Sequence, residues 1–424
     1  MRDDGSRQRS LAALSLLCFA LADVRDGLGP FFGVYLQSHG WGPDAIGYVM
    51  TLGGLMGVVA ASPLGALVDA SHDKRRLLTV VVLGIVLAAV AVFLSPLPLV
   101  AGASQITQGL LAAAVAPLIS ALSLGLVGQA GLSARLGRNE AWNHAGNAAS
   151  AVLGGAVGWF YGIGGVLLVM AGMGLLSLLA VRGIQPQHID YAAARGLETA
   201  ERTQAAGPAP SRLSLLFGDK ALLCTGGIML FFHLGNAAML PLLGQSAVAH
   251  FDVDPAVYTA CTVLVAQGTM ILTALWAAWI APRRGYGPAL FCALIALPVR
   301  GLVAGFWQSP WNIVPVQILD GVGAGIMGVV TPGMVALLLR GSGHINLGLG
   351  MVMTLQGIGA AFSATWGGVV ADLYGYSMAF LALAVAPCVA LLLLLAGIRF
   401  LPRLRDALSR QESRQIGRYK AEVR

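Results

Sequence analysis

The chain has 424 residues, of which 57% are hydrophobic and only 11% are charged. Soluble domains carry about 25% charged residues, so this composition excludes an ordinary soluble protein. A membrane-spanning helix needs about 20 apolar residues, and the chain supplies such stretches almost from end to end. The 56 glycines fit helices that pack closely in lipid. We therefore predict an all-α polytopic membrane protein.

Twelve apolar stretches, separated by polar turns, predict twelve transmembrane helices. The first six spans are expected at 11–36, 45–69, 77–96, 98–128, 140–162 and 164–182. The second six are expected at 220–247, 255–281, 287–307, 309–339, 346–374 and 377–399. No cleavable signal peptide is evident, because the first apolar stretch is too long and lacks a small-residue cleavage site.

The basic residues predict the orientation of these spans. Of the 26 Lys and Arg residues, 24 lie in the N-terminus, in the loops after even-numbered spans or in the C-terminal tail, counting the terminal residues of the spans that adjoin them. The other two, Arg25 and Arg300, lie inside spans. Because Lys and Arg are retained in cytoplasmic loops, we expect an inner-membrane protein with both termini in the cytoplasm. The net charge of +7 is then mainly a signal of topology.

The sequence contains an internal duplication. The stretch "AGNAASAVLGGAVGWFYG" (145–162) matches "IGAAFSATWGGVVADLYG" (358–375) at nine of eighteen positions. "QITQG" (105–109) similarly matches "QILDG" (317–321). These matches predict an N-terminal six-helix half at 1–182, a cytoplasmic linker at 183–219 and a C-terminal half at 220–400. A basic cytoplasmic tail at 401–424 follows.

Two pseudo-symmetric six-helix halves with cytoplasmic termini resemble the major facilitator superfamily (MFS) of secondary transporters. The loop "GALVDASHDKRR" (65–76) is similar to a motif of that family, a glycine and an aspartate followed by a basic cluster. Gly65, Asp69, Lys74 and Arg75 match the motif. The resemblance implies that this loop acts as a conformational latch between the halves. The bland alternative is an ordinary basic cytoplasmic loop.

Several positions depart from the pattern of proton-coupled drug exporters in that family. Ala70, His72 and Asp73 replace the usual basic and glycine residues of the loop. Gln105 stands where such exporters carry an arginine in span 4, and "VLGGAVG" (152–158) in span 5 lacks the usual proline. The resemblance therefore favours a transporter in general over a drug antiporter.

Span 1 contains three charged residues, Asp23, Arg25 and Asp26, just before the helix-breaking stretch "GLGP" (27–30). Charges in a membrane span are costly and usually face a protein interior, and interrupted helices often border transporter substrate sites. We predict that Asp26, or else Asp23, binds a coupling proton and that Arg25 binds substrate. A purely structural charge cluster is the alternative.

Other polar residues inside spans extend the candidate site. Glu140, His144 and Asn147 form one stripe along span 5, where His144 is a further candidate for proton coupling. The remaining substrate-binding candidates are Asn143, Asn147, His233, Asn236, Gln108, Gln317 and Gln356. Satisfied helix packing is the alternative for each of them.

Arg300 in span 9 and Asp320 in span 10 lie at similar depths, counted from the turn that joins their spans. We predict a structural ion pair between them, with proton coupling through Asp320 as the other possibility. No phosphate-binding loop and no His/Cys pattern typical of metal ligands is present. We accordingly expect no enzyme activity, no cofactor and no metal.

The sequence thus predicts a proton-coupled secondary transporter that works by alternating access, with export favoured. Its expected partners are a small-molecule substrate, protons and membrane lipids, without nucleic acid, and we expect a monomer. The first alternative is an uptake symporter for a small organic anion bound by Arg25. A non-transporting membrane receptor or scaffold on the same fold is the alternative from another class.

Overall fold

The computed structural model describes the whole chain except residues 1, 26–27, 192–193, 195–217, 341–344 and 410–424. The described residues form helices joined by short turns and contain no strand. Ten stretches of helix among them are long and apolar enough to cross a membrane. Spans 1 and 5, the two predicted spans outside these ten, also consist of helix in their described residues, apart from a break in span 1. Most of the predicted linker and of the tail lies outside the described residues.

The chain divides into two compact units. Unit 1 comprises residues 1–40, 52–209 and 253–261, and unit 2 comprises residues 41–51, 210–252 and 262–424. The units follow the two predicted halves except for two short segments, 41–51 and 253–261, which belong to the other unit. The boundaries that the sequence suggests for the halves stay a prediction.

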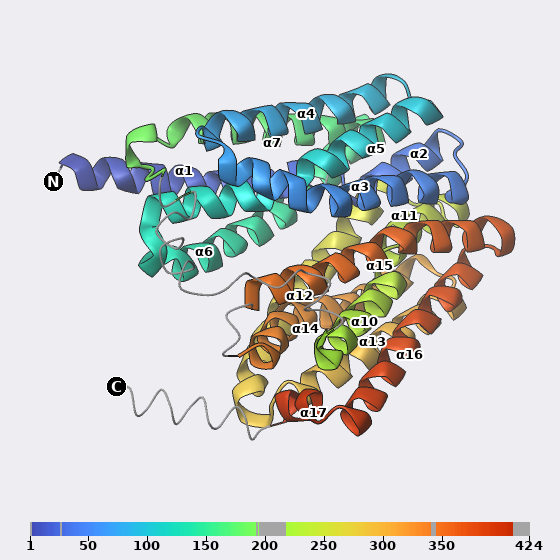
Figure 1. Cartoon of the computed structure of the whole chain (residues 1–424). Helices are drawn as coiled ribbons and strands as arrows, with labels where there is room; N and C mark the ends of the chain where they lie inside the picture. The colour runs from blue at the N-terminus through green and yellow to red at the C-terminus, as the bar shows by residue number, and fades with distance from the viewer. Residues whose placement is uncertain (1, 26–27, 192–193, 195–217, 341–344, 410–424) are drawn as a thin grey trace. The chain divides into compact units, whose positions relative to one another are not determined.

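Unit 1 is a bundle of long helices (Figure 1). Its elements are α1 (Arg2–Arg25), α2 (Pro30–Ser38), most of α3 (Pro43–Ala70), α4 (Lys74–Leu94), α5 (Pro98–Ala112), α6 (Val115–Tyr161) and α7 (Val166–Gly183). The long element α6 covers the second part of span 4 and nearly all of span 5. Gly128 interrupts the helix between these two spans, with a φ of 66° that favours glycine. Within the unit, α1 packs against α6 and α7.

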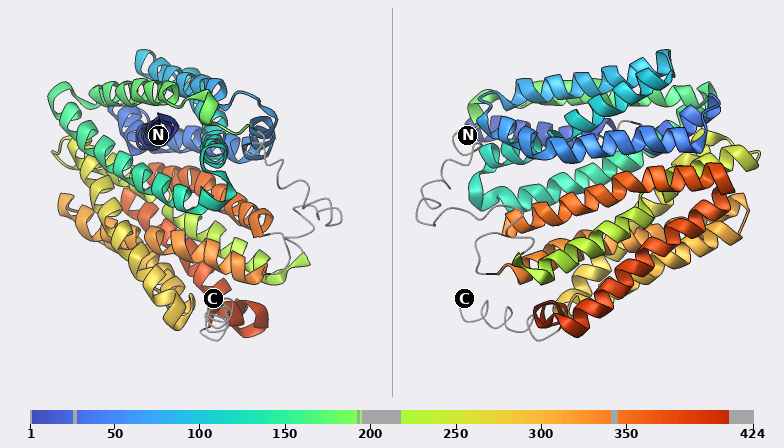
Figure 2. Two further views of the ribbon diagram at one scale, coloured as in Figure 1. Left: turned by 90° about the vertical axis from the view of Figure 1, so that its left-hand side faces the viewer. Right: turned by 45° about the vertical axis from the view of Figure 1, so that its right-hand side comes forward.

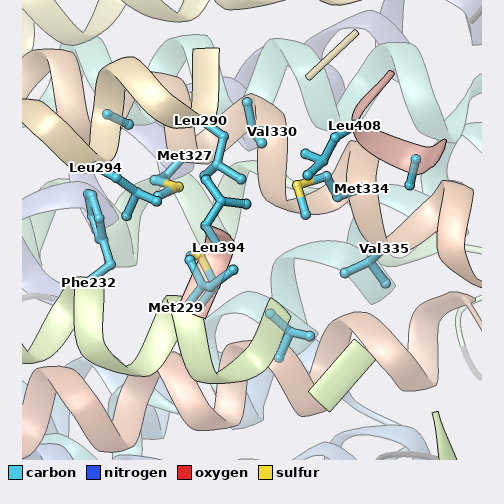
Figure 3. Packing of buried hydrophobic residues seen from close by; sticks show 14 of the residues in the cluster. Met229, Phe232, Leu290, Leu294, Met327, Val330, Met334, Val335, Leu394 and Leu408 are labelled. Atoms are coloured by element: carbon cyan, nitrogen blue, oxygen red, sulfur yellow. The ribbon is translucent and has the colours of Figure 1, made fainter. Parts of the chain in front are cut away.

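Unit 2 contains the remaining long helices. They are α10 (Lys220–Asn236), α11 (Met239–His250), most of α12 (Pro255–Arg284), α13 (Gly287–Phe306), α14 (Ile313–Leu338), α15 (Ile345–Tyr374), α16 (Tyr376–Phe400) and the short α17 (Pro402–Leu408). Both views in Figure 2 show the long helices of each unit running alongside one another. Figure 3 shows the unit's core, where side chains of α10, α13, α14 and α16 meet.

The internal duplication reappears as repeated helix contacts. In unit 1, a Cβ atom on Gly146 of α6 would collide with the backbone carbonyl of Phe19 in α1. In unit 2, a Cβ atom on Gly359 of α15 would collide with the carbonyl of Leu230 in α10. Gly146 and Gly359 are equivalent positions of the longer sequence repeat. The repeated glycine therefore lets the first and fifth helices of each half approach closely.

A second repeated contact joins the second and fourth spans of each half. A Cβ atom on Gly109 of α5 would collide with the carbonyl of Gly53 in α3. Its equivalent, Gly321 of α14, faces the carbonyl of Ala266 in α12 in the same way. The short repeat "QITQG" and "QILDG" thus places a glycine where two backbones touch.

Basic side chains cap the ends of helices that finish at the arginine-rich loops. Arg7 donates to the carbonyl of Leu126 through two nitrogens, at 3.2 and 2.7 Å. Arg403 donates to the carbonyl of Leu338, the last residue of α14, at 2.7 Å. A cation at a helix C-terminus satisfies open carbonyls and complements the helix dipole. Such residues therefore stabilise helix ends.

Candidate functional site

Span 1 is broken where the sequence predicts an interruption. Helix α1 ends at Arg25, and α2 begins at Pro30. Between them Leu28 has a φ of 73°, which is uncommon for a residue other than glycine, and Gly29 has a φ of 48°. Strained backbone of this kind persists where the surrounding structure enforces it, often at a functional site. Asp26, the preferred proton-coupling candidate, lies outside the described residues.

The charged end of α1 borders a small cavity in unit 1. Arg25 is half-buried and lines this cavity, whose volume is about 100 Å³, together with Glu140 and Asn143 of α6. Asp23 is also half-buried in the last turn of α1. The structure thus brings together Arg25 and Asn143, two of the residues that the sequence suggests for substrate binding.

Span 7 is broken at the equivalent position of the second half. Helix α10 ends at Asn236 and α11 begins at Met239. The backbone N–H of Ala238 donates to Ser363 Oγ at 2.9 Å, while Asn236 O and Oδ1 accept from Arg300 at 3.4 and 2.6 Å. Side chains from α13 and α15 therefore satisfy backbone groups that the break releases, as a helix in lipid requires.

Arg300 and Asp320, which the sequence pairs, lie 3.0 Å apart, measured from Nη1 to Oδ1. Arg300 is completely buried, Asp320 is 6% exposed, and Arg300 also donates to Gln317 Oε1 at 3.4 Å. The guanidinium lies at the C-terminal end of α10, where the helix dipole favours a positive charge. This cluster connects α13 and α14 to the break in span 7. Whether its role is structural or includes proton transfer stays a prediction.

Unit 2 also contains a cavity of about 420 Å³ beside α10. His233 and Gln356 line it, as do three methionines, Met229, Met327 and Met353. Methionine is flexible and polarizable, so it adapts to irregular apolar ligands. A largely apolar cavity with a few polar groups is the usual form of a small-molecule site. Thr331 in its wall is itself hydrogen-bonded to the sulfur of Met229 at 3.2 Å.

His233 has a defined tautomer when it is neutral. Its Nδ1 lies 3.0 Å from the carbonyl of Met229. A carbonyl only accepts, so Nδ1 carries the hydrogen in this bond. In the neutral ring Nε2 is consequently an acceptor. The cavity therefore offers a ligand one acceptor from His233 and an amide, with donor and acceptor, from Gln356.

Other predicted residues lie apart from these cavities. Gln108 is buried and donates to Ser104 Oγ at 2.7 Å, within the packing of α4 against α5. Gln317 belongs to the Arg300 cluster, and His144 and Asn147 are half-buried on α6. Among the described residues, no group of three or more His, Cys, Asp or Glu side chains could hold a metal ion.

In the motif loop, two basic residues cap helices of unit 1. Lys74 is completely buried, and its ammonium donates to the carbonyls of Val68, Asp69 and Ser71 at the end of α3. Arg75 donates to the carbonyl of Val181, near the end of α7, at 3.1 Å. Asp69 is exposed, and a Cβ atom on Gly65 would meet no neighbour within 4 Å.

Sequence reasoning did not find three features of the site. The methionines of the unit 2 cavity come from α10, α14 and α15 and share no motif. Ser363 gives no sequence signal for its bond to Ala238. Lys74 was expected in a latch, whereas its buried cap on α3 depends on the path of the loop. The charged residues of span 1 and the "GLGP" stretch that follows them were the local signals that pointed to the site, whereas the break in span 7 was not predicted.

A membrane bundle with duplicated halves, broken helices at equivalent positions and buried charges beside one break defines a class of protein, the transporters. Residues 14–339 match the family model described as Major Facilitator Superfamily. The chain is 40% identical over 382 residues to an uncharacterized MFS-type transporter found in two strains of Mycobacterium tuberculosis. That match covers 88% of this chain and 90% of the relative.

Solved structures share the fold at low sequence identity. The nucleoside transporter NupG superposes with a TM-score of 0.71 at 15% identity, covering 93% of this chain and 99% of NupG. A D-xylose–proton symporter gives a TM-score of 0.68 at 12% identity, covering 91% of this chain and 96% of the symporter. The chain belongs to the major facilitator superfamily and is a multi-pass membrane transporter with the all-α fold of that family.

Proposed function

We propose that the chain is a secondary active transporter that exports a small molecule by alternating access, coupled to protons. The observation that carries this proposal is the pair of helix breaks, α1–α2 and α10–α11, at equivalent positions of the two halves. In transporters such discontinuous helices border substrate and coupling-ion sites. Interior carboxylates and histidines supply groups that can exchange protons.

We also place the protein in the inner membrane as a monomer, with cytoplasmic termini. The distribution of Lys and Arg supports this orientation. The D-xylose–proton symporter among the similar folds is compatible with proton coupling. Because its identity to this chain is 12%, it bears on the fold and not on the substrate.

A transport assay in proteoliposomes tests the proposal. The purified chain is reconstituted and offered a panel of neutral, cationic and anionic compounds, with a pH gradient of either sign or none. Export coupled by proton exchange requires a compound to move against the direction of the protons. Movement with the protons, for an anion, would favour the uptake alternative through Arg25. Binding without transport of any compound would favour a receptor on this fold.

We propose that the unit 2 cavity is the part of the substrate site formed by the C-terminal half. Replacing His233 with leucine should weaken substrate binding about 2–10-fold, because one hydrogen bond contributes about 0.5–1.5 kcal/mol. His250→Leu is the matched control, since His250 Nδ1 also lies near a carbonyl four residues back, that of Ser246 at 3.1 Å. His250 does not line the cavity. Equal affinities of the two variants, measured by equilibrium binding, would remove His233 from the site.

We propose that Asp69 acts in a latch between conformational states, while Lys74 stabilises α3. Asp69→Asn should leave the thermal unfolding midpoint unchanged, because the carboxylate is exposed, and should change the rate of substrate exchange. Lys74→Met should lower the midpoint, because three carbonyls lose a charged donor and such a bond contributes about 1.5–3 kcal/mol. If the Asp69→Asn protein is stable and its rate of substrate exchange is unaltered, Asp69 does not act in a latch, and the loop is an ordinary basic loop.

A further inference from the structure

Unit 1 has a basic groove that the proposed transport site does not use. It lies between the first half of α1 and the second part of α6, with a volume of about 740 Å³. Two arginines of α6, Arg135 and Arg138, line it opposite residues of α1 that include Gln8 and Ser15. Both arginines belong to the loop region before span 5, on the side of the membrane that carries the basic loops.

Arg135 is a buried cation whose hydrogen-bonding capacity is incompletely used. Its side chain is 5% exposed, and its Nη2 donates to Ser15 Oγ at 2.9 Å. Its Nε is buried and has no partner among the described residues. Burial lowers the pKa of Arg135; the neighbouring Cys18 opposes this shift, and the charge of Arg138 adds to it. A buried guanidinium with an unsatisfied donor is costly, and an anion in the groove would relieve this cost.

Arg138 adds a second positive charge on the same face of α6. It follows Arg135 by three residues, which places both on one side of the helix. Arg138 is exposed, whereas Arg135 is buried. The groove therefore presents one guanidinium to solvent and one within the wall. Two guanidiniums suit the bidentate recognition of a phosphate group.

The groove changes from polar to apolar along its length. Ser15 of α1 contacts Arg135, and Phe19 stacks edge-on against Trp142 at 6.2 Å between ring centroids. The two helices are therefore parallel here. Along α6 the wall passes from Arg135 to Trp142 over about 10 Å, at about 1.5 Å per residue. Trp142 is 43% exposed, and Leu16 on the facing helix is 39% exposed.

We propose that this groove binds an anionic phospholipid from the leaflet that faces the basic loops. The phosphate would contact Arg135 and Arg138, and an acyl chain would lie along Leu16 and Trp142. Basic pockets between transmembrane helices bind anionic headgroups in this way, and tryptophan is enriched at the membrane interface. A free phosphate shares the headgroup chemistry, but it would leave the apolar part of the groove without a role.

Native mass spectrometry of the purified, delipidated full chain tests the proposal. Phosphatidylglycerol and phosphatidylcholine with identical acyl chains are titrated separately. The parent protein should bind the anionic lipid more tightly. Arg138→Gln should weaken that binding about fivefold, because one basic residue contributes about 1 kcal/mol near an anionic membrane surface. The double variant Arg135→Gln/Arg138→Gln should lose the preference for the anionic lipid.

Arg284→Gln is the matched control, because Arg284 is an exposed arginine at the end of α12 in unit 2. It should bind both lipids as the parent does. Equal binding of the two lipids by the parent would overturn the proposal. An equal loss of affinity for phosphatidylglycerol in Arg138→Gln and Arg284→Gln would also overturn it. Displacement of the lipid by millimolar inorganic phosphate would also overturn it in favour of a small-anion site. If the double variant does not fold, the result for Arg138→Gln alone tests the proposal.

Discussion

Replacing Asp320 with alanine should lower the free energy of unfolding of the C-terminal half by about 3–5 kcal/mol, because it leaves a buried cation without its partner. Arg300 is completely buried and bonds Asp320 at 3.0 Å. The guanidinium cannot release its proton under ordinary conditions. The thermal unfolding midpoint in detergent, followed by intrinsic fluorescence, measures the effect.

A double variant separates the charge from the packing. In Arg300→Met/Asp320→Leu both charges are removed together, and replacement of a buried pair by apolar residues is often neutral or stabilising. The double variant should still be less stable than the parent, because the carbonyl and side-chain oxygens of Asn236 lose the hydrogen-bond donor that Arg300 provides. That loss leaves a cost of about 1–3 kcal/mol. A double variant less stable than Asp320→Ala would contradict a purely electrostatic origin.

Asp406→Ala is the control for a superficial pair. Asp406 lies 3.6 Å from Arg405, and both side chains are more than half exposed, at 64% and 60%. Exposed pairs contribute about 0–1 kcal/mol, so this variant should unfold close to the parental midpoint. If Asp320→Ala and Asp406→Ala lower the unfolding midpoint equally, burial does not determine the strength of the pair between Arg300 and Asp320.

The same variants distinguish a structural role of Asp320 from proton coupling. A structural pair predicts that the double variant, once folded, still accumulates substrate in response to a pH gradient. A coupling role predicts that it loses accumulation while retaining substrate exchange without a gradient. The measurement is uptake into proteoliposomes with and without the gradient, at equal amounts of folded protein.

Features set by one stretch of sequence or by counting along helices could be predicted. "GLGP" predicted the break between α1 and α2, because glycine and proline disfavour continued helix. Counting residues from a turn predicted that Arg300 and Asp320 could pair, and they do lie in contact. The repeat predicted two similar halves, and its glycines mark the contacts of Gly146 with Phe19 and of Gly359 with Leu230.

Features that depend on several helices at once could not be predicted. The unit 2 cavity forms where methionines of α10, α14 and α15 meet, and no helical period reveals which apolar residues leave a space. The burial of Lys74 requires its loop to fold back on α3. Arg135 gave only a topology signal, because its contact with Ser15 joins positions 120 residues apart.

Replacing Asp26 with asparagine should abolish proton-driven accumulation of substrate and leave exchange without a pH gradient intact. Asparagine resembles the protonated acid in shape, but it cannot take up or release a proton. The reason to choose Asp26 is its place directly after Arg25, where α1 ends, and before the strained Leu28. Charges tolerated at such a break face protein or a water-filled cavity.

Accumulation and exchange are measured in the same proteoliposome preparation, with Asp44→Asn as the matched control. Asp44 lies in the first turn of α3, at a helix end as Asp26 does in the sequence, but it follows no helix break. Arg25→Lys tests the neighbouring cation: it keeps the charge but loses the planar fork, so affinity for a carboxylate or phosphate should fall. If Asp26→Asn accumulates substrate at the parental rate with the parental pH dependence, Asp26 does not carry the proton. The coupling group must then be sought at Asp23, His144 or Asp320, of which Asp320 is already committed to a cation 3.0 Å away.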